Sequence, residues 1–272
     1  MANMNEAGVP AAVAISPSFT DPPLLEVALA VEFAPLAEFG ATVMADLARQ
    51  WSDRYPHVQE HPPLPPNMAV GFPSPTAGMI VSMGAPQIRL WLLTEPGDRL
   101  VQLQRDRLIV NWRSASTKGS YPRYWDSLRP EFETDFERLR AFLRERSLSL
   151  PRAISTEVTY VNALTNLHDA DLVGVLRSQA RVAHHLGKPA TTRLSQTWNR
   201  MVENAVTSTL TLNIEAQAEG DAMLILTGRS AVATDAEPSD VLGSLDVCHD
   251  DVVASFVELT DERRHKQWGR IS

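Results

Sequence analysis

Two histidines and a glutamate stand at the spacing of a zinc peptidase motif, in the segment His57-Val58-Gln59-Glu60-His61. The H-x-x-E-H pattern works on a helix, where both imidazoles lie on one face and bind Zn²⁺ while the glutamate activates a water molecule. Pro56 precedes the segment and Pro62-Pro63 follows it, and proline disfavours helical geometry in the residue before it. We interpret the match as chance, and we expect no metal ion and no other cofactor.

A cysteine, a histidine and two aspartates are adjacent in Cys248-His249-Asp250-Asp251. A cysteine nucleophile needs a lowered pKa and a nearby base. Neighbours on a helix point about 100° apart, so these side chains do not converge on one site. We expect Cys248 to be a buried, inert thiol, with His249 and Asp250 facing solvent.

A third segment, His184 to Pro189, contains Gly187-Lys188-Pro189 and is similar to a fragment of a phosphate-binding loop. The full spacing is absent and a proline occupies the hydroxyl position. The chain also lacks G-x-G-x-x-G and G-x-S-x-G. Nucleotide-dependent and standard hydrolase chemistries therefore have no support, and we assign no catalytic residue.

Arginines and aromatic residues interleave between Arg105 and Arg129, in a window that is basic within an acidic protein. Such side chains suit phosphate or base contacts, and equally suit the hot spots of protein interfaces. The alternative is that the aromatic residues pack the loop onto the sheet while the arginines are solvated. The candidate contacts are Arg105, Arg107, Trp112, Arg113, Tyr121, Arg123, Tyr124 and Trp125.

The C-terminal segment Asp261 to Arg270 is dense in charge but carries a tryptophan. We expect Trp268 to pack against the body of the protein, Gly269 to end the helix with a positive φ, and Arg270 to reach a carboxylate. The alternative is a partner-binding tail, with His265, Trp268 and Arg270 as its contacts.

Composition indicates a globular protein, because 44% of the 272 residues are hydrophobic and 21% are charged. The formal net charge of −8 disfavours non-specific binding to nucleic acid, so a nucleic-acid partner at the arginine window is not favoured. A single cysteine forms no intramolecular disulfide. We expect a cytoplasmic protein with no membrane association, and a disordered tail at residues 1–20.

Hydrophobic periodicity predicts strand, helix, strands and helix in the first half of the chain. The predicted elements are a strand at Leu24–Phe33, a helix at Glu38–Tyr55, an extended proline-rich loop at Pro56–Pro75, strands at Ile88–Leu93 and Leu100–Trp112 with a turn at Arg105-Asp106-Arg107, and a helix at Arg129–Arg146.

The second half repeats that order. Its predicted elements are a strand at Ile154–Leu164, a helix at Asp169–Leu186, strands at Arg193–Glu203, Val206–Ala216 and Ala222–Ala233, a helix at Pro238–Leu259, and a short last helix capped by Thr260 or Asp261.

The fold class is therefore α+β, with two similar units at residues 21–150 and 151–272 and antiparallel-rich sheets covered by helices. The join lies near Pro151, and Leu24-Leu25-Glu26-Val27 corresponds to Ser155-Thr156-Glu157-Val158. This pattern indicates an internal duplication packed as one body. The alternative is that any α+β chain can be divided in this way.

Two short motifs carry a resemblance to a known family. They are the opening Pro22-Pro23-Leu24-Leu25-Glu26-Val27, and the closing Phe256-Val257-Glu258-Leu259-Thr260 with His265 and Trp268-Gly269-Arg270. With these the chain resembles a sporadically distributed family of uncharacterised bacterial proteins of about this length. Scattered occurrence implies horizontally moved genes, such as defence or toxin–antitoxin cassettes.

Three functions remain open from the sequence. The first is a non-enzymatic interaction protein with a protein partner, such as a subunit of a bacterial defence or toxin-neutralising complex. The second is a small-molecule or nucleotide-binding protein with a cleft between sheet and helices. The third is an enzyme whose acid–base residues are distant in sequence, with His249, Asp250 and His265 as the first to inspect.

Overall fold

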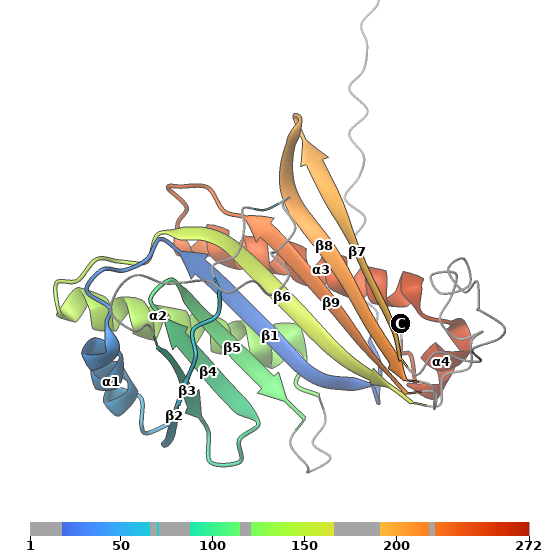
Figure 1. The fold of residues 1–272 in the computed structure, drawn as a ribbon, viewed down its shortest axis with the longest axis horizontal. Coiled ribbons are helices and arrows are strands. Elements are labelled where there is room, and N and C mark those ends of the chain that lie inside the picture. Colours follow the sequence, from blue (N-terminus) through green and yellow to red (C-terminus); the bar gives the residue numbers. More distant parts are fainter. Residues whose placement is uncertain are drawn as a thin grey trace, which may run out of the picture.

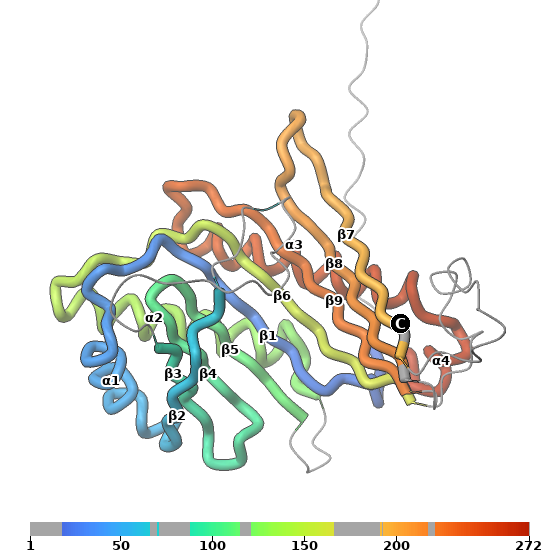
Figure 2. The backbone as a smooth tube through the Cα atoms, in the orientation of Figure 1, coloured from blue at the N-terminus to red at the C-terminus, as the bar shows by residue number. Residues whose placement is uncertain are grey.

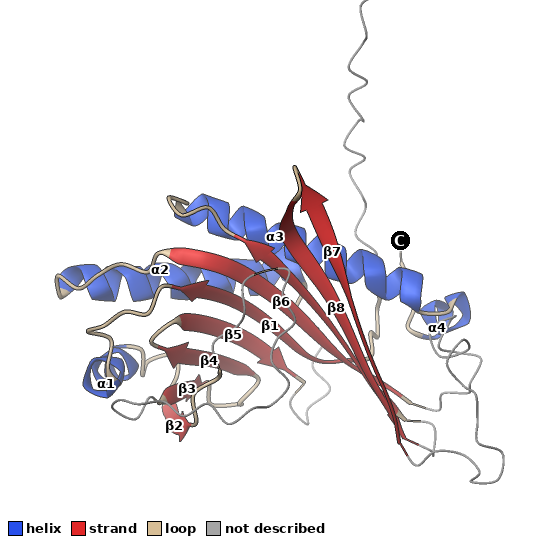
Figure 3. Ribbon diagram, turned by 45° about the horizontal axis from the view of Figure 1, so that its top comes forward, coloured by secondary structure: helices blue, strands red, loops and turns tan. Residues whose placement is uncertain are grey.

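The computed structural model describes residues 18–65, 70, 88–114, 121–165, 191–217 and 221–271. Over these ranges the chain forms one nine-stranded antiparallel sheet, and its long helices lie against one face of that sheet (Figures 1 and 3). The strand order is β2-β3-β4-β5-β1-β6-β9-β8-β7.

The bounds of the elements agree closely with the hydrophobic periodicity of the chain. The first half contributes β1 (Leu24–Phe33), α1 (Ala41–Gln50), β2 (His57–His61), β3 (Arg89–Leu93), β4 (Arg99–Gln104), β5 (Arg107–Arg113), the π-helical turn η1 (Tyr124–Leu128) and α2 (Arg129–Glu145). The second half contributes β6 (Ala153–Leu164), β7 (Thr191–Val202), β8 (Ala205–Gln217), β9 (Ala222–Ala231), α3 (Pro238–Leu259) and α4 (Glu262–Gln267).

Strand β1 lies at the centre of the sheet and shows how sequence sets its two faces. Successive side chains of a strand point to opposite faces, so Val27, Leu29 and Val31 all lie in the core beneath the helices. Glu26 and Glu32 lie on the opposite face, where Glu26 accepts a hydrogen bond from the side-chain amide of Asn111 at 2.6 Å.

Helices α2 and α3 supply the apolar layer that covers the core face (Figure 1). The buried stripe of α2 contains Phe132, Phe136 and Leu139, and that of α3 contains Leu245 and Val252. A methylene group buried in this way stabilises the fold by about 0.8 kcal/mol, so each of these side chains contributes to the stability of the helix–sheet interface.

The α+β class is confirmed, and the strands of the two halves join edge to edge in a single antiparallel sheet. The two halves meet because β1 pairs with β6, with Ala28 opposite Thr159 near the middle of both strands. Pairing the first strand of each half in this way leaves no sheet edge at the join.

Two local predictions differ from the structure. Residues His57–His61 form an edge strand, β2, which pairs with β3, where an extended proline-rich loop was expected. Prolines flank this strand, and an edge position tolerates them. The first helix runs only over Ala41–Gln50 and is shorter than predicted. Gly40 precedes it, and a turn replaces the last residues that were predicted to be helical. The predicted helix at Asp169–Leu186 lies outside the described residues.

The two ends of the described chain lie side by side. Phe19 forms a β-bridge with Arg270, and the backbone N–H of Thr20 donates to the carbonyl of Gly269 at 3.1 Å. Gly269 has a φ of +64°, and a side chain there would collide with Thr20. The positive φ predicted for Gly269 is confirmed, and Ser18 to Thr20, which fall within the predicted disordered tail, are hydrogen-bonded to the C-terminal segment. We call this pairing the terminal clasp.

The hairpin of β7 and β8 projects away from the helical layer, at the far end of the sheet from β2 (Figure 2). It exposes three large apolar side chains of β7, whose relative exposures are 44% for Trp198, 55% for Met201 and 52% for Val202.

Candidate functional site

A cavity of about 350 Å³ lies between the core face of the sheet, α3, the turn η1 and the terminal clasp. Its lining is dominated by aromatic side chains. The lining residues are Ser18, Phe19, Pro22, Leu24, Tyr121, Arg123, Tyr124, Trp125, Asp126, Tyr160, Asn162, His249, Val253 and Phe256. We call it the histidine–tyrosine pocket.

A chain of hydrogen bonds joins the buried polar groups of this pocket. The Nδ1 atom of His249 lies 3.1 Å from the hydroxyl of Tyr160, and that hydroxyl lies 2.8 Å from the hydroxyl of Tyr121. His249 projects from α3, Tyr160 from β6, and Tyr121 from the segment before η1. Three elements distant in sequence therefore meet at one polar chain.

Tyr124 fixes the orientation of the His249 ring. The two rings are stacked with centroids 3.8 Å apart and an angle of 7° between their planes. The Tyr124 hydroxyl donates to the carboxylate of Asp246 at 2.9 Å, and Arg129 Nε donates to the same carboxylate oxygen at 2.8 Å. The start of α2 is thereby tied to α3 on the outer side of the pocket.

The titratable groups inside the pocket are uncharged near neutral pH. Burial lowers the pKa of His249 to about 3, because the charged imidazolium loses its hydration. Burial raises the pKa of Tyr121 to about 12 and holds the pKa values of Tyr124 and Tyr160 above their usual range. The interior is therefore a neutral hydrogen-bonding surface enclosed by aromatic rings.

Exposed residues form the mouth of the pocket. Arg123, Trp125 and Asp126 line the cavity and are exposed to solvent. Trp125 is 48% exposed, meets the His249 ring edge-on at 5.9 Å, and lies beneath the guanidinium of Arg129 at 5.8 Å. Aromatic side chains commonly line ligand sites.

The terminal clasp forms one wall. Phe19 meets Phe256 edge-on at 5.8 Å and Trp268 at 6.2 Å, so the packing predicted for Trp268 is confirmed. His265 is buried behind Phe19, where its Nε2 lies 2.7 Å from the hydroxyl of Thr260 and its Nδ1 lies 3.3 Å from Arg270. The C-terminal residues therefore hold Phe19 against the pocket.

The structure divides the predicted arginine–aromatic window. Tyr121, Arg123, Tyr124 and Trp125 meet at the pocket. Trp112 is buried behind Tyr121, with its ring centroid 5.5 Å from that ring.

The other members of the window lie elsewhere on the sheet. Arg107 is buried and pairs with Glu32 at 3.0 Å, and Arg105 donates to the carbonyl oxygen of Ala37 at 2.8 Å. Arg113 lies over the ring of Trp91, on the sheet face opposite the helices. These arginines stabilise turns and the sheet face opposite the helices.

The expectation that His249 faces solvent is wrong. His249 is 4% exposed, because α3 packs against η1 on one side and against the sheet on the other. Cys248 is buried as expected, and burial raises its pKa to about 12, so the thiolate nucleophile does not form near neutral pH. His249 and His265 have different hydrogen-bond partners, Tyr160 for His249 and Thr260 for His265.

The segment His57–His61 is a strand, whereas zinc binding by the H-x-x-E-H motif requires a helix. His57 and His61 are four residues apart on strand β2, which separates their Cα atoms by about 13 Å. The His57 Nε2 lies 2.9 Å from a carboxylate oxygen of Glu95, and the ring of His61 stacks on Trp91 at 3.9 Å. Within the described residues, no group of three potential metal-ligating side chains comes together.

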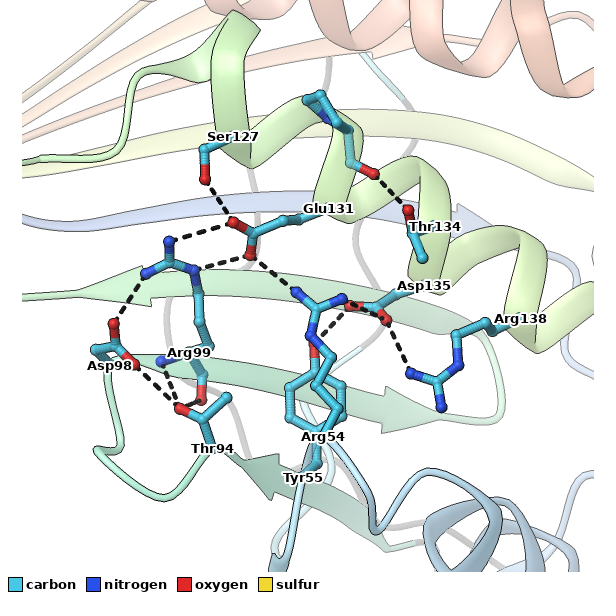
Figure 4. A network of polar contacts seen from close by, with 11 residues as sticks. Arg54, Tyr55, Thr94, Asp98, Arg99, Ser127, Glu131, Thr134, Asp135 and Arg138 are labelled. Atoms are coloured by element: carbon cyan, nitrogen blue, oxygen red, sulfur yellow. Dashed lines mark hydrogen bonds and ion pairs between the residues drawn. The ribbon is translucent and has the colours of Figure 1, made fainter.

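A second polar network lies on the other side of α2, and Figure 4 shows how its charges are matched. Glu131 accepts hydrogen bonds from Arg99 at 2.8 Å and from Arg54 at 3.0 Å. Asp135 is fully buried and accepts a hydrogen bond from Tyr55 at 2.6 Å. These contacts join α2 to β4 and to the segment after α1, and we interpret the network as structural.

No protein-family model and no curated protein matches this chain.

In the part of the chain that the structure describes, no helix has the length and apolar character needed to cross a membrane.

Proposed function

We propose that this protein binds a small organic molecule in the histidine–tyrosine pocket. The observation that carries the proposal is a preformed cavity of about 350 Å³ with aromatic walls and a few fixed polar groups. Ligand sites typically have volumes of about 300–1,000 Å³, apolar walls and a small number of orienting hydrogen-bond groups.

The chemistry of the pocket favours binding over acid–base catalysis. A general base works best when its pKa lies near the working pH. The pKa of His249 is about 3, and the phenols are held in their neutral forms by burial. These groups can orient a ligand through hydrogen bonds, whereas proton transfer near neutral pH is unfavourable for each of them.

A fragment screen with two matched variants tests the proposal. Val253 lines the pocket, whereas Val247, on the same helix, is 40% exposed and lies outside it. We expect saturation-transfer NMR to detect aromatic fragments that bind the wild type and Val247→Phe but not Val253→Phe, in which the larger ring fills the cavity. Fragment binding that Val253→Phe leaves unchanged would place the ligand elsewhere and refute the proposal.

A protein partner is the second candidate, and the exposed edge of the sheet favours it. β7 is the outermost strand and exposes Trp198, Met201 and Val202. An edge strand with apolar side chains can pair with another chain. A role in a bacterial defence or toxin-neutralising complex remains a proposal on this basis. Co-purification from the intact native operon tests it, and recovery of the protein alone and monodisperse would contradict it.

We also propose that the two halves of the chain arose by duplication, and strand register supports this. Glu26 of β1 stands opposite Arg113 of β5, and Glu157 of β6 stands opposite Arg229 of β9. The offset in residue number between Glu26 and Glu157 also relates residues 24–33 to residues 155–164. Superposition of 24–33 and 107–113 on 155–164 and 223–229 in an experimental structure tests the proposal, and a poor fit of these strands would contradict it.

A further inference from the structure

The mouth of the pocket lies at the positive end of a helix. η1 continues directly into α2, so Tyr124 to Glu145 form one helical segment, and Arg123 occupies its N-cap. No side chain among the described residues caps this end. The first backbone N–H groups of a helix carry a partial positive charge and favour anions and hydrogen-bond acceptors.

Arg123 adds a full positive charge at the same place. It lines the cavity, is exposed, and has no carboxylate within 4.0 Å in the part of the chain that the structure describes. A guanidinium group binds carboxylates through two parallel hydrogen bonds. Asp126 lies at the mouth as well, and it opposes an anion there. The positive end of the helix and the guanidinium of Arg123 act against this carboxylate and against Asp250, whose charge reaches Tyr160.

Inside the pocket, a chain of hydrogen bonds ends at His249. The hydroxyls of Tyr121 and Tyr160 lie 2.8 Å apart, and either can donate to the other. The Tyr160 hydroxyl lies 3.1 Å from Nδ1 of His249. A neutral imidazole carries one hydrogen, so one of its ring nitrogens donates and the other accepts.

His249 therefore offers a polar ring edge to a ligand. Its side chain is 4% exposed and lines the pocket. A ligand group that hydrogen-bonds to the imidazole would be oriented by it, as the few polar groups of a ligand site usually do.

We propose that the ligand of this pocket is an aromatic carboxylate. The ring lies between the aromatic walls, the carboxylate is met by Arg123 and the helix N-terminus, and the imidazole of His249 supplies a further hydrogen-bonding group. This inference rests on the proposed small-molecule function and specifies the ligand class. The same aromatic walls could also enclose an organic cation, and the experiment below separates the two classes.

Three probes with the same ring and different charges test the inference. They are 2-naphthoate, 2-naphthalenemethanol and 2-naphthylmethylammonium, titrated by calorimetry into the full-length protein. We expect 2-naphthoate to bind at least about tenfold more tightly than the alcohol, as a charge-assisted hydrogen bond permits. We expect the ammonium probe to bind most weakly.

The variant Arg123→Gln should reduce the affinity for 2-naphthoate to about that of the alcohol and leave the alcohol unchanged. Arg152→Gln is the matched control, because Arg152 is also exposed but precedes β6 and does not line the pocket. Equal affinities for the three probes, or a preference for the ammonium probe, would overturn the carboxylate inference while leaving small-molecule binding intact. Failure of all three probes to bind would count against the proposed function itself.

Discussion

The imidazole of His249 lies parallel to the phenol ring of Tyr124, with a centroid separation of 3.8 Å and an interplanar angle of 7°. This stack joins the start of the α2 segment to the middle of α3 and forms the rigid side of the pocket. The hydroxyl of Tyr124 donates a hydrogen bond to the carboxylate of Asp246.

Shortening Tyr124 separates the contribution of its hydroxyl from that of its ring. Tyr124→Phe keeps the stack and loses the hydrogen bond to Asp246, so we expect the free energy of unfolding to fall by about 1 kcal/mol. Tyr124→Ala also removes a buried ring, and a loss of roughly 3–5 kcal/mol is expected. Urea denaturation measures both values. Equal losses for the two variants would mean that the ring does not pack as described.

Acid should destabilise the protein through His249. The histidine pKa is about 6.5 in the unfolded chain and about 3 in the folded protein, so between these values only the unfolded chain binds a proton. The free energy of unfolding is therefore not reduced by His249 above pH 6.5, and it falls as the pH decreases toward 3. The loss is at most about 1.4 kcal/mol per pH unit for this one group.

The comparison of the wild type with His249→Phe isolates that effect. Burial raises the pKa values of Asp135 and Glu157, and these groups act in the opposite direction. The difference in pH dependence between wild type and variant removes their contribution. We expect His249→Phe to lose stability less steeply between pH 6.5 and 4 than the wild type, with His57→Gln as the exposed-histidine control. Parallel curves for His249→Phe and wild type would show that His249 is already accessible to protons.

The terminal clasp should contribute measurably to stability. Trp268 is partly buried against Phe19 and Phe256, so Trp268→Ala should cost about 2 kcal/mol, less than a fully buried indole. Phe19→Ala should be coupled to it, and the double variant should lose less than the sum of the two single losses. Ile271→Ala is the control, because Ile271 is 58% exposed. If Trp268→Ala leaves stability unchanged but releases a co-purifying partner, the clasp is an interface.

Removing the hydroxyl of Tyr55 should destabilise the network beside α2. Tyr55→Phe leaves the buried carboxylate of Asp135 without its 2.6 Å hydrogen bond, and a loss of about 1–3 kcal/mol is expected in chemical denaturation. The control is Thr134→Val, whose exposed hydroxyl donates to the carbonyl of Pro130. A loss for Tyr55→Phe no larger than for the control would indicate that water replaces the tyrosine.

Hydrophobic periodicity in the sequence predicted most of the helices and strands, but it did not predict the pocket. The bounds of α3 agree with the prediction, because Pro238 suits the first helical turn and the apolar stripe continues to Leu259. β2 was missed because a short edge strand between prolines has no apolar alternation of its own. The burial of His249 was missed because α3 packs on two sides.

The pocket itself has only a partial signal in the sequence. Tyr121, Tyr124 and Trp125 fall in the arginine–aromatic window between Arg105 and Arg129. Tyr160 and Phe19 reach the same cavity through the pairing of β1 with β6 and through the terminal clasp. Both contacts join residues far apart in the chain, and local spacing carries no information about them.

A crystal structure of the protein saturated with 2-naphthoate tests the central claim most directly. We expect electron density for the naphthyl ring within the histidine–tyrosine pocket, in contact with Tyr160 and Trp125, and a carboxylate oxygen within hydrogen-bond distance of Arg123. An empty pocket in the saturated crystals, or a probe bound only at another surface such as the exposed edge of β7, would contradict the account.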